Sequence, residues 1–196
     1  MKRRKFSPIV ILGICLILAS FLLMIGFQIR MELGTRKCEA IVTEMESLLP
    51  DRTAGVTGLD LYAGMPALEI DGVDYVALLE IPVFDIALPV ANRWDSGKLS
   101  NAPARFAGSA YENTLVIGGA DHRGQFAFCS RIDHGVLVTV TDMTGAQFTY
   151  TVVRVDRADH AESQWLMAED YDLTLFCHDS DSGNYIAVRC ASGFQK

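Results

Sequence analysis

Cys177, His122 and Arg189 are residues of this 196-residue chain whose side chains together suit one chemistry, acyl transfer. In that reaction a thiolate attacks a carbonyl carbon, an imidazolium protonates the leaving amine, and a guanidinium stabilises the oxyanion. A charged histidine also lowers the pKa of a neighbouring thiol. We rank His178 below His122 as the acid/base, because neighbouring residues of a strand point to opposite faces.

Each of the three residues ends or follows an apolar run that is typical of a short strand. The runs are Leu173–Phe176 before Cys177, Tyr185–Val188 before Arg189, and Thr114–Ile117 before the glycine loop that leads to His122. If these strands are neighbours, their ends bring the thiol, the guanidinium and the imidazole to one cleft. A competing interpretation stays open, because a free cysteine is often a small buried hydrophobic residue.

The region from about Tyr75 onward predicts a mainly β fold. The other β-rich runs are Tyr75–Ile81, Ile86–Val90, Val136–Thr141 and Gln147–Val155. Asp142–Gly145, between the last two, has the composition of a hairpin turn. Open sheet edges are costly, so six or more short strands with few helices favour a closed or nearly closed β-barrel.

The first 30 residues differ from the rest. Ile9–Phe27 carries no charge, and about 20 apolar residues are enough to cross a membrane. The run is too long for a signal-peptide core and no cleavage site follows it, so we expect an uncleaved anchor. The basic cluster Lys2–Lys5 places the N-terminus in the cytoplasm and the remainder outside. Met31–Leu49 has helical periodicity, and Asp51–Ala67 has the composition of a linker.

The expected organisation is a cytoplasmic tail over residues 1–8, a transmembrane anchor over 9–29, a juxtamembrane helix and linker over 30–70, and a β-barrel over 71–196. Charge divides the chain in the same way. Residues 1–30 hold five of the 17 Lys and Arg and none of the 24 Asp and Glu, so the remainder has a formal charge of −12. So acidic a domain has no electrostatic footprint for nucleic acid.

The chain has five cysteines, of which Cys15 lies in the apolar run. An odd number leaves at least one thiol free, and a disulfide between two of Cys129, Cys177 and Cys190 stays open as an alternative. No Cys-x-x-Cys or His-x-His pair stands at ligand spacing, so we expect no Cys/His metal site. We also expect no cofactor, and calcium binding at the acidic loop Asp179–Asp181 stays open as a less favoured alternative.

From about Val76 to Ala191 the order of short motifs resembles that of the sortase family. The matching segments are Ala77–Pro82, Leu88–Val90, Leu99, Gly108–Ser109, Asn113–Gly118, His122–Arg123, Phe126–Val138, Leu173–Cys177 and Val188–Arg189. Leu173–Cys177 is similar to the family's Thr-Leu-x-Thr-Cys motif, and His122–Arg123 to its Gly-His-Arg. Phe176 and Asp121 depart from these motifs and leave the subclass open, with class B- and class D-like patterns both considered.

The resemblance implies a closed eight-stranded β-barrel with short helices, preceded by a transmembrane helix. It implies a cysteine transpeptidase with Cys177 as nucleophile, His122 as general acid/base and Arg189 as oxyanion or substrate stabiliser. The expected partners are surface proteins or pilins with a C-terminal Leu-Pro-x-Thr-Gly-like sorting motif. A thioacyl-enzyme would pass them to an amine of a peptidoglycan precursor or a pilin lysine, at the outer face of a Gram-positive-type membrane.

Two other interpretations stay open. One is a non-catalytic, membrane-tethered β-barrel that binds peptide or cell-wall polymer and has no need of a reactive Cys177. The other is a thiol hydrolase that releases its substrate to water.

Overall fold

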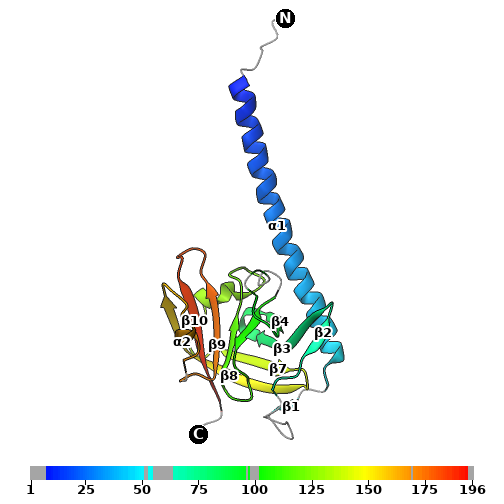
Figure 1. Cartoon of the computed structure of the whole chain (residues 1–196), viewed down its shortest axis with the longest axis vertical. Coiled ribbons are helices and arrows are strands. Elements are labelled where there is room, and N and C mark those ends of the chain that lie inside the picture. Colours follow the sequence, from blue (N-terminus) through cyan, green and yellow to red (C-terminus); the bar gives the residue numbers. More distant parts are fainter. Residues whose placement is uncertain are drawn as a thin grey trace, which may run out of the picture.

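The computed structural model describes residues 8–50, 53–54, 64–95, 97, 102–168 and 170–193. The basic cluster Lys2–Lys5, the motif residue Leu99 and most of the expected linker Asp51–Ala67 lie outside these residues. One long helix stands on a β-barrel, with its N-terminal end far from the strands (Figure 1).

Eight of the described strands close into a barrel, which confirms the mainly β fold. They are β3 (Val73–Ile81), β4 (Ile86–Ala91), β5 (Ala104–Ala107), β6 (Leu115–Gly118), β7 (Leu137–Asp142), β8 (Ala146–Ala158), β9 (Leu173–His178) and β10 (Tyr185–Ser192). They pair in the order β3-β4-β5-β6-β9-β10-β8-β7, and β7 pairs with β3 to complete the ring. Strand β5 is not predicted from the sequence, because its four residues show no alternation of apolar and polar side chains.

Short elements complete the barrel. The strands β1 (Thr53–Ala54) and β2 (Leu68–Ile70) pair with β8 and β3. The short helices are η1 (Pro82–Phe84), η2 (Phe126–Ser130) and α2 (Ser163–Leu166), as the resemblance implies. The helix α2 lies in the segment that joins β8 to β9 and covers the outer face of the sheet there.

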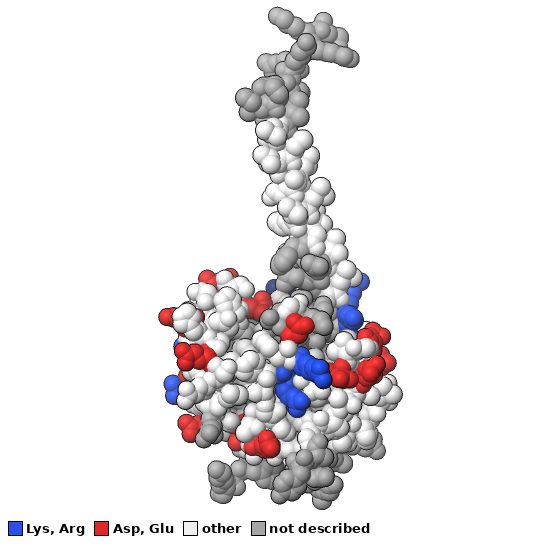
Figure 2. Space-filling view, in the orientation of Figure 1, with Lys and Arg blue, Asp and Glu red and all other residues white. Residues whose placement is uncertain are grey.

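Helix α1 (Pro8–Leu48) runs unbroken through the expected anchor and the expected juxtamembrane helix. Its C-terminal part docks on the barrel, where Cys38, Ile41, Val42 and Met45 pack with Ile70, Tyr75, Leu78 and Ala102. Figure 2 shows the white, uncharged surface of α1 away from the barrel. Over the residues that the structure describes, no helix combines the length and apolar character that crossing a membrane requires. The anchor therefore stays a prediction.

The turn expected at Asp142–Gly145 joins β7 to β8. Gly145 has a φ of 83°, a backbone conformation that glycine adopts without strain. The buried Asp142 carboxylate accepts hydrogen bonds from the backbone N–H groups of Thr144 (2.8 Å) and Ala146 (2.9 Å). These contacts hold the hairpin that closes the barrel.

Strand β9 is buried on both faces, which explains why Leu173–Cys177 is almost continuously apolar. Its odd-numbered residues, Cys177 among them, point into the barrel core. Its even-numbered residues point outward, where Phe176 packs with Leu166 of α2. Because side chains alternate along a strand, these faces decide which groups can meet.

Candidate functional site

Cys177 lies in the barrel core rather than in a cleft. Its side chain is 2% exposed, and its thiol donates a hydrogen bond to the carbonyl oxygen of Phe126 at 3.8 Å. The thiols of Cys129 and Cys190 lie in the same core cluster. Burial raises the pKa of Cys129 well above its ordinary value, helped by a hydrogen bond with Cys177. Burial also raises the pKa of Cys190 to about 12. The structure holds all three as free thiols.

Arg189 lies on the opposite face of the sheet from Cys177. The strands β9 and β10 are neighbours, but Arg189 pairs with Thr174 while Cys177 pairs with Ile186. The guanidinium is 1% exposed and bound on the outer face, with Nε 3.3 Å from Oδ2 of Asp156. The expected juxtaposition of thiol and guanidinium is therefore wrong. The cause is alternation: both residues are buried, on opposite sides of one sheet layer.

His122 lies in the loop between β6 and η2 and is partly exposed. The loop lies beside the end of β9, because Gly119 N–H donates to the Phe176 carbonyl at 3.0 Å. The backbone N–H of Ser180 also donates to Oδ2 of Asp121 at 2.9 Å. The histidine loop and the end of β9 therefore come together as expected, although the Cys177 thiol faces inward. The role of His122 stays a prediction.

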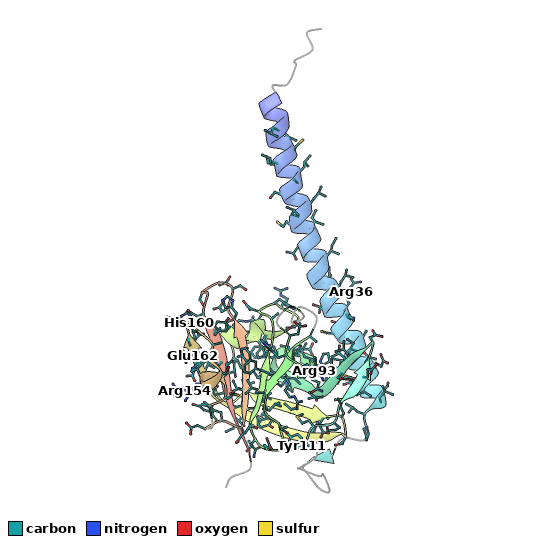
Figure 3. All side chains as sticks on the ribbon, viewed as in Figure 1. Arg36, Arg93, Tyr111, Arg154, His160 and Glu162 are labelled. Atoms are coloured by element: carbon teal, nitrogen blue, oxygen red, sulfur yellow. The ribbon has the colours of Figure 1, made fainter. Side chains whose placement is uncertain are left out.

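A pocket of about 350 Å³ lies on the outer face, between the sheet and the segment that joins β8 to β9. Its lining consists of Ala107, Gly108, Thr114, Val116, Leu166, Met167, Ala168, Tyr171 and Thr174. Figure 3 labels His160 and Glu162 near the start of the joining segment, on the side of the barrel away from Arg36. Among the described lining residues, no side chain carries a formal charge. The pocket therefore suits an uncharged, largely apolar group.

Aromatic side chains cover the outer face beside this pocket. Phe176 of β9 lies 5.2 Å from the ring of Trp94 and 5.5 Å from that of Phe106, measured between centroids. A Cβ on Gly118 would lie 2.1 Å from an atom of Trp94, so the cluster packs directly on the backbone of β6. Sequence reasoning missed this cluster, because its three rings come from separate segments.

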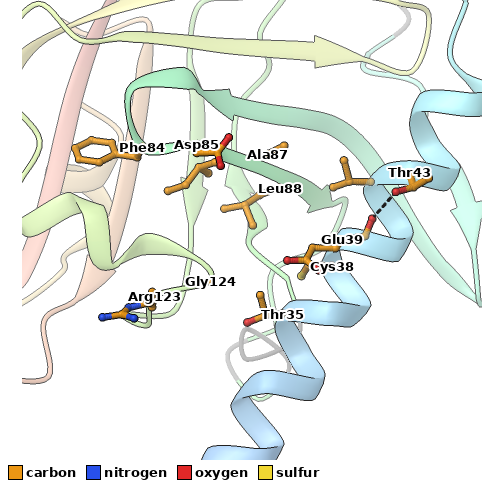
Figure 4. Close-up of a pocket in the computed structure, with 12 residues that line it drawn as sticks. Thr35, Cys38, Glu39, Thr43, Phe84, Asp85, Ala87, Leu88, Arg123 and Gly124 are labelled. Carbon is orange, nitrogen blue, oxygen red and sulfur yellow. Dashed lines mark hydrogen bonds between the residues drawn. The ribbon is translucent and has the colours of Figure 1, made fainter.

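A second pocket, of about 390 Å³, separates α1 from β4 and η1 (Figure 4). Glu39, Asp85 and Arg123 bring both signs of charge to its lining. Burial raises the pKa of Cys38, another lining residue, to about 11, and Glu39 adds to the rise. In the part of the chain that the structure describes, no group of three or more His, Cys, Asp or Glu could hold a metal ion.

The comparisons with known proteins support the topology. No family model matches the sequence, and no curated protein matches it. Solved structures do. Sortase C1 of Streptococcus agalactiae is 16% identical over 72% of this chain and 79% of that one, with a TM-score of 0.55. The chain has the sortase fold.

Other solved sortases agree with this assignment. Sortase A of Corynebacterium diphtheriae is 14% identical over 85% of each chain, with a TM-score of 0.52. The Clostridium perfringens sortase D5 transpeptidase is 17% identical over 61% of this chain and 79% of that one, with a TM-score of 0.50. At such identities the likeness establishes the fold. Since these neighbours come from classes C, A and D, the subclass is not determined.

The sortase motif accounts for the inward direction of the Cys177 thiol. In Thr-Leu-x-Thr-Cys, the first threonine and the cysteine are four residues apart and share a strand face. Here Cys177 is three residues after Thr174, whereas His178 is four after it. His178 therefore occupies the outward position that the motif gives to its cysteine. Its exposed ring lies 5.0 Å from the ring of Tyr185, its partner on β10. The four-residue spacing between Thr174 and His178 is therefore the feature of the sequence from which the outward position of His178 can be predicted.

Proposed function

We propose that the barrel has a sortase-like function of peptide recognition: it binds a peptide segment in the outer pocket, between the sheet and the segment that joins β8 to β9. We further propose that Cys177 does not attack that peptide in the conformation described. The observation that carries this proposal is the inward direction of the Cys177 side chain at 2% exposure. A nucleophile must approach a carbonyl carbon to about 3–3.5 Å. A peptide on the outer face is separated from this thiol by the sheet itself.

The outer pocket supports recognition without cleavage. It is uncharged, and its two sides come from different parts of the chain, since Val116 and Thr174 belong to the sheet while Leu166 and Tyr171 belong to the joining segment. A concave, mostly apolar site with a few polar groups is the usual form of a ligand pocket. This proposal corresponds to the non-catalytic, peptide-binding interpretation of the sequence.

The test is affinity selection from a peptide library that includes Leu-Pro-x-Thr-Gly sequences, with the full-length chain in mild detergent. Ala168→Trp should fill the pocket and abolish retention of the selected peptides. Val153→Trp, at an exposed position of β8, is the matched control and should retain them. Equal retention by both variants would show that the peptides bind elsewhere and would overturn the proposal.

Transpeptidation remains the second candidate, favoured by the likeness to solved sortases of several classes. In that case the substrates would be surface proteins or pilins with a sorting motif, and the acceptor a cell-wall or pilin amine. The reaction would require β9 to rotate its Cys177 side chain outward, or the attack to come from another residue. Product analysis with and without triglycine separates transfer from hydrolysis.

We also propose that the N-terminal part of α1 anchors the chain in a membrane, with the barrel outside the cell. Support comes from the uncharged run Ile9–Phe27 and from the exposed apolar side chains between Leu12 and Ile29. The protein should stay in the membrane fraction after an alkaline wash, and protease added to intact cells should digest the barrel. Release by the wash, or full protection from protease, would contradict the anchor or its orientation.

A further inference from the structure

We infer that Arg189 is a positioning residue: it holds the segment that joins β8 to β9 against the sheet and thereby shapes the outer pocket. This inference rests on the proposed function of that pocket. It gives Arg189 a different role from that of a charge beside a reacting thiol. Arg189 does not line the pocket, but it contacts three residues that do, Leu166, Tyr171 and Thr174.

The first set of contacts joins the guanidinium to the end of α2. Nη1 donates to the carbonyl oxygen of Leu166 at 3.0 Å, and Nη2 donates to that of Trp165 at 2.6 Å. The last carbonyls of a helix have no partner within it, and α2 has only four residues. A cation at this end also interacts favourably with the helix carbonyls. Arg189 therefore caps the C-terminal end of α2 and fixes the position of Leu166, which lines the pocket.

The second set of contacts joins the guanidinium to the sheet and to two rings. Nη1 also donates to Oγ1 of Thr174 at 3.0 Å, and Nε lies 3.3 Å from Oδ2 of Asp156. The guanidinium carbon is 4.9 Å from the ring centroid of Trp165 and 5.3 Å from that of Tyr171. Arginine in such positions makes favourable cation–π contacts. One buried group thus ties α2, the later part of the segment and two strands together.

Lysine cannot reproduce this arrangement. The planar guanidinium presents its donors in a rigid fork, whereas an ammonium is a compact point charge with three donors. A lysine at position 189 keeps the charge opposite Asp156 but cannot reach both α2 carbonyls and Thr174 together. Arg189→Lys should therefore loosen the segment while it leaves the rest of the barrel folded.

The experiment measures hydrogen–deuterium exchange and peptide affinity on the full-length chain. We expect Arg189→Lys to speed exchange in residues 159–172 about tenfold, the effect of losing about one hydrogen bond, and to weaken peptide binding by a similar factor. Exchange in β3 and β7 should be unchanged. Arg157→Lys, at an exposed position one residue after Asp156, is the matched control and should change neither readout.

Trp165→Leu provides a second variant, should Arg189→Lys fail to fold. It removes one ring contact from the segment side, where Trp165 is only partly buried, and should speed exchange in the same residues to a smaller extent. Unchanged exchange in the segment, or a uniform rise across the whole barrel, would overturn the positioning role. If exchange responds as expected but the unmodified chain binds no peptide, the positioning role is supported and the proposed function fails.

Discussion

Cys177 and Arg189 lie on adjacent strands of the barrel but on opposite faces of the sheet. The thiol contacts Phe126 in the core, and the guanidinium is held under α2. On the outer face, the residues that pair across β9 and β10 at the end of β9 are His178 and Tyr185. The pocket and both strands are present, but the sheet separates the Cys177 thiol from the Arg189 guanidinium.

The buried position of Cys177 predicts slow thiol chemistry. At pH 8, iodoacetamide should label Cys177 at least about 100-fold more slowly in the native protein than in urea, because reaction requires local opening of the core. His178→Cys should label quickly, since position 178 is exposed. Mass spectrometry of the digested protein gives both rates. Labelling of native Cys177 as fast as that of His178→Cys would place the thiol outside the core.

The outward pair on β9 and β10 predicts a gain of chemistry. In the double variant His178→Cys/Tyr185→Arg, a thiol and a guanidinium face each other across the strand pair. With a peptide that the pocket retains, the new thiol should attack a peptide carbonyl, break the C–N bond and release the C-terminal fragment as an amine, which leaves a thioacyl adduct visible as a mass increase. His178→Cys/Tyr185→Phe is the control without the cation and should accumulate less adduct. A double variant that binds peptide but forms no adduct would contradict the assignment of this face.

Packing of the aromatic cluster predicts that Gly118→Ala is destabilising. The new Cβ would lie 2.1 Å from an atom of Trp94 and 2.6 Å from one of Phe176, so the rings must move. Overpacking of this kind costs about 1–3 kcal/mol of unfolding free energy. Gly193→Ala, where no neighbouring atom lies within 4 Å, should change it by less than about 0.5 kcal/mol. Urea unfolding followed by tryptophan fluorescence measures both; equal values would contradict the packing.

The raised thiol pKa values predict a loss of stability in alkali. Burial raises the pKa of Cys190 to about 12 from an ordinary value of 9.0. The folded state then keeps a proton that the unfolded state loses, so this stabilisation is complete below pH 9 and is lost as the pH rises toward 12. The free energy of unfolding should fall between pH 9 and pH 11, and fall less steeply in Cys190→Ala. The same slope in both proteins would contradict the assignment.

Much of the barrel is predictable from the sequence, because most of its strands are short apolar runs bounded by glycine, proline or polar turn residues. The runs containing Leu175 and Val188 are predicted as strands and form β9 and β10, and the turn residues before Gly145 predict the hairpin between β7 and β8. The site was less predictable because it depends on strand face. An alignment that matches Cys177 to the cysteine of the motif differs by one residue from an alignment that matches Thr174 to its first threonine. A shift of one residue along a strand moves each side chain to the opposite face of the sheet.

The remaining features of the site depend on contacts between distant segments. Arg189 looks like a free surface charge in the sequence, and its partners Asp156 and Trp165 lie 33 and 24 residues away. The outer pocket requires β5, which has no strand pattern, and the end of α2, which is a single turn. Such features follow from the fold and from no local pattern.

The central claim is that the chain binds peptide without acylation of Cys177. The most direct test is mass spectrometry of the protein after incubation with peptide. The full-length chain is incubated with the retained sorting-motif peptide and triglycine, and the intact protein and its Cys177-containing fragment are weighed. The account predicts bound peptide, an unmodified Cys177 and no transfer to triglycine. An acyl adduct on Cys177 that passes to triglycine, and that is lost in Cys177→Ala, would contradict it and establish the transpeptidase.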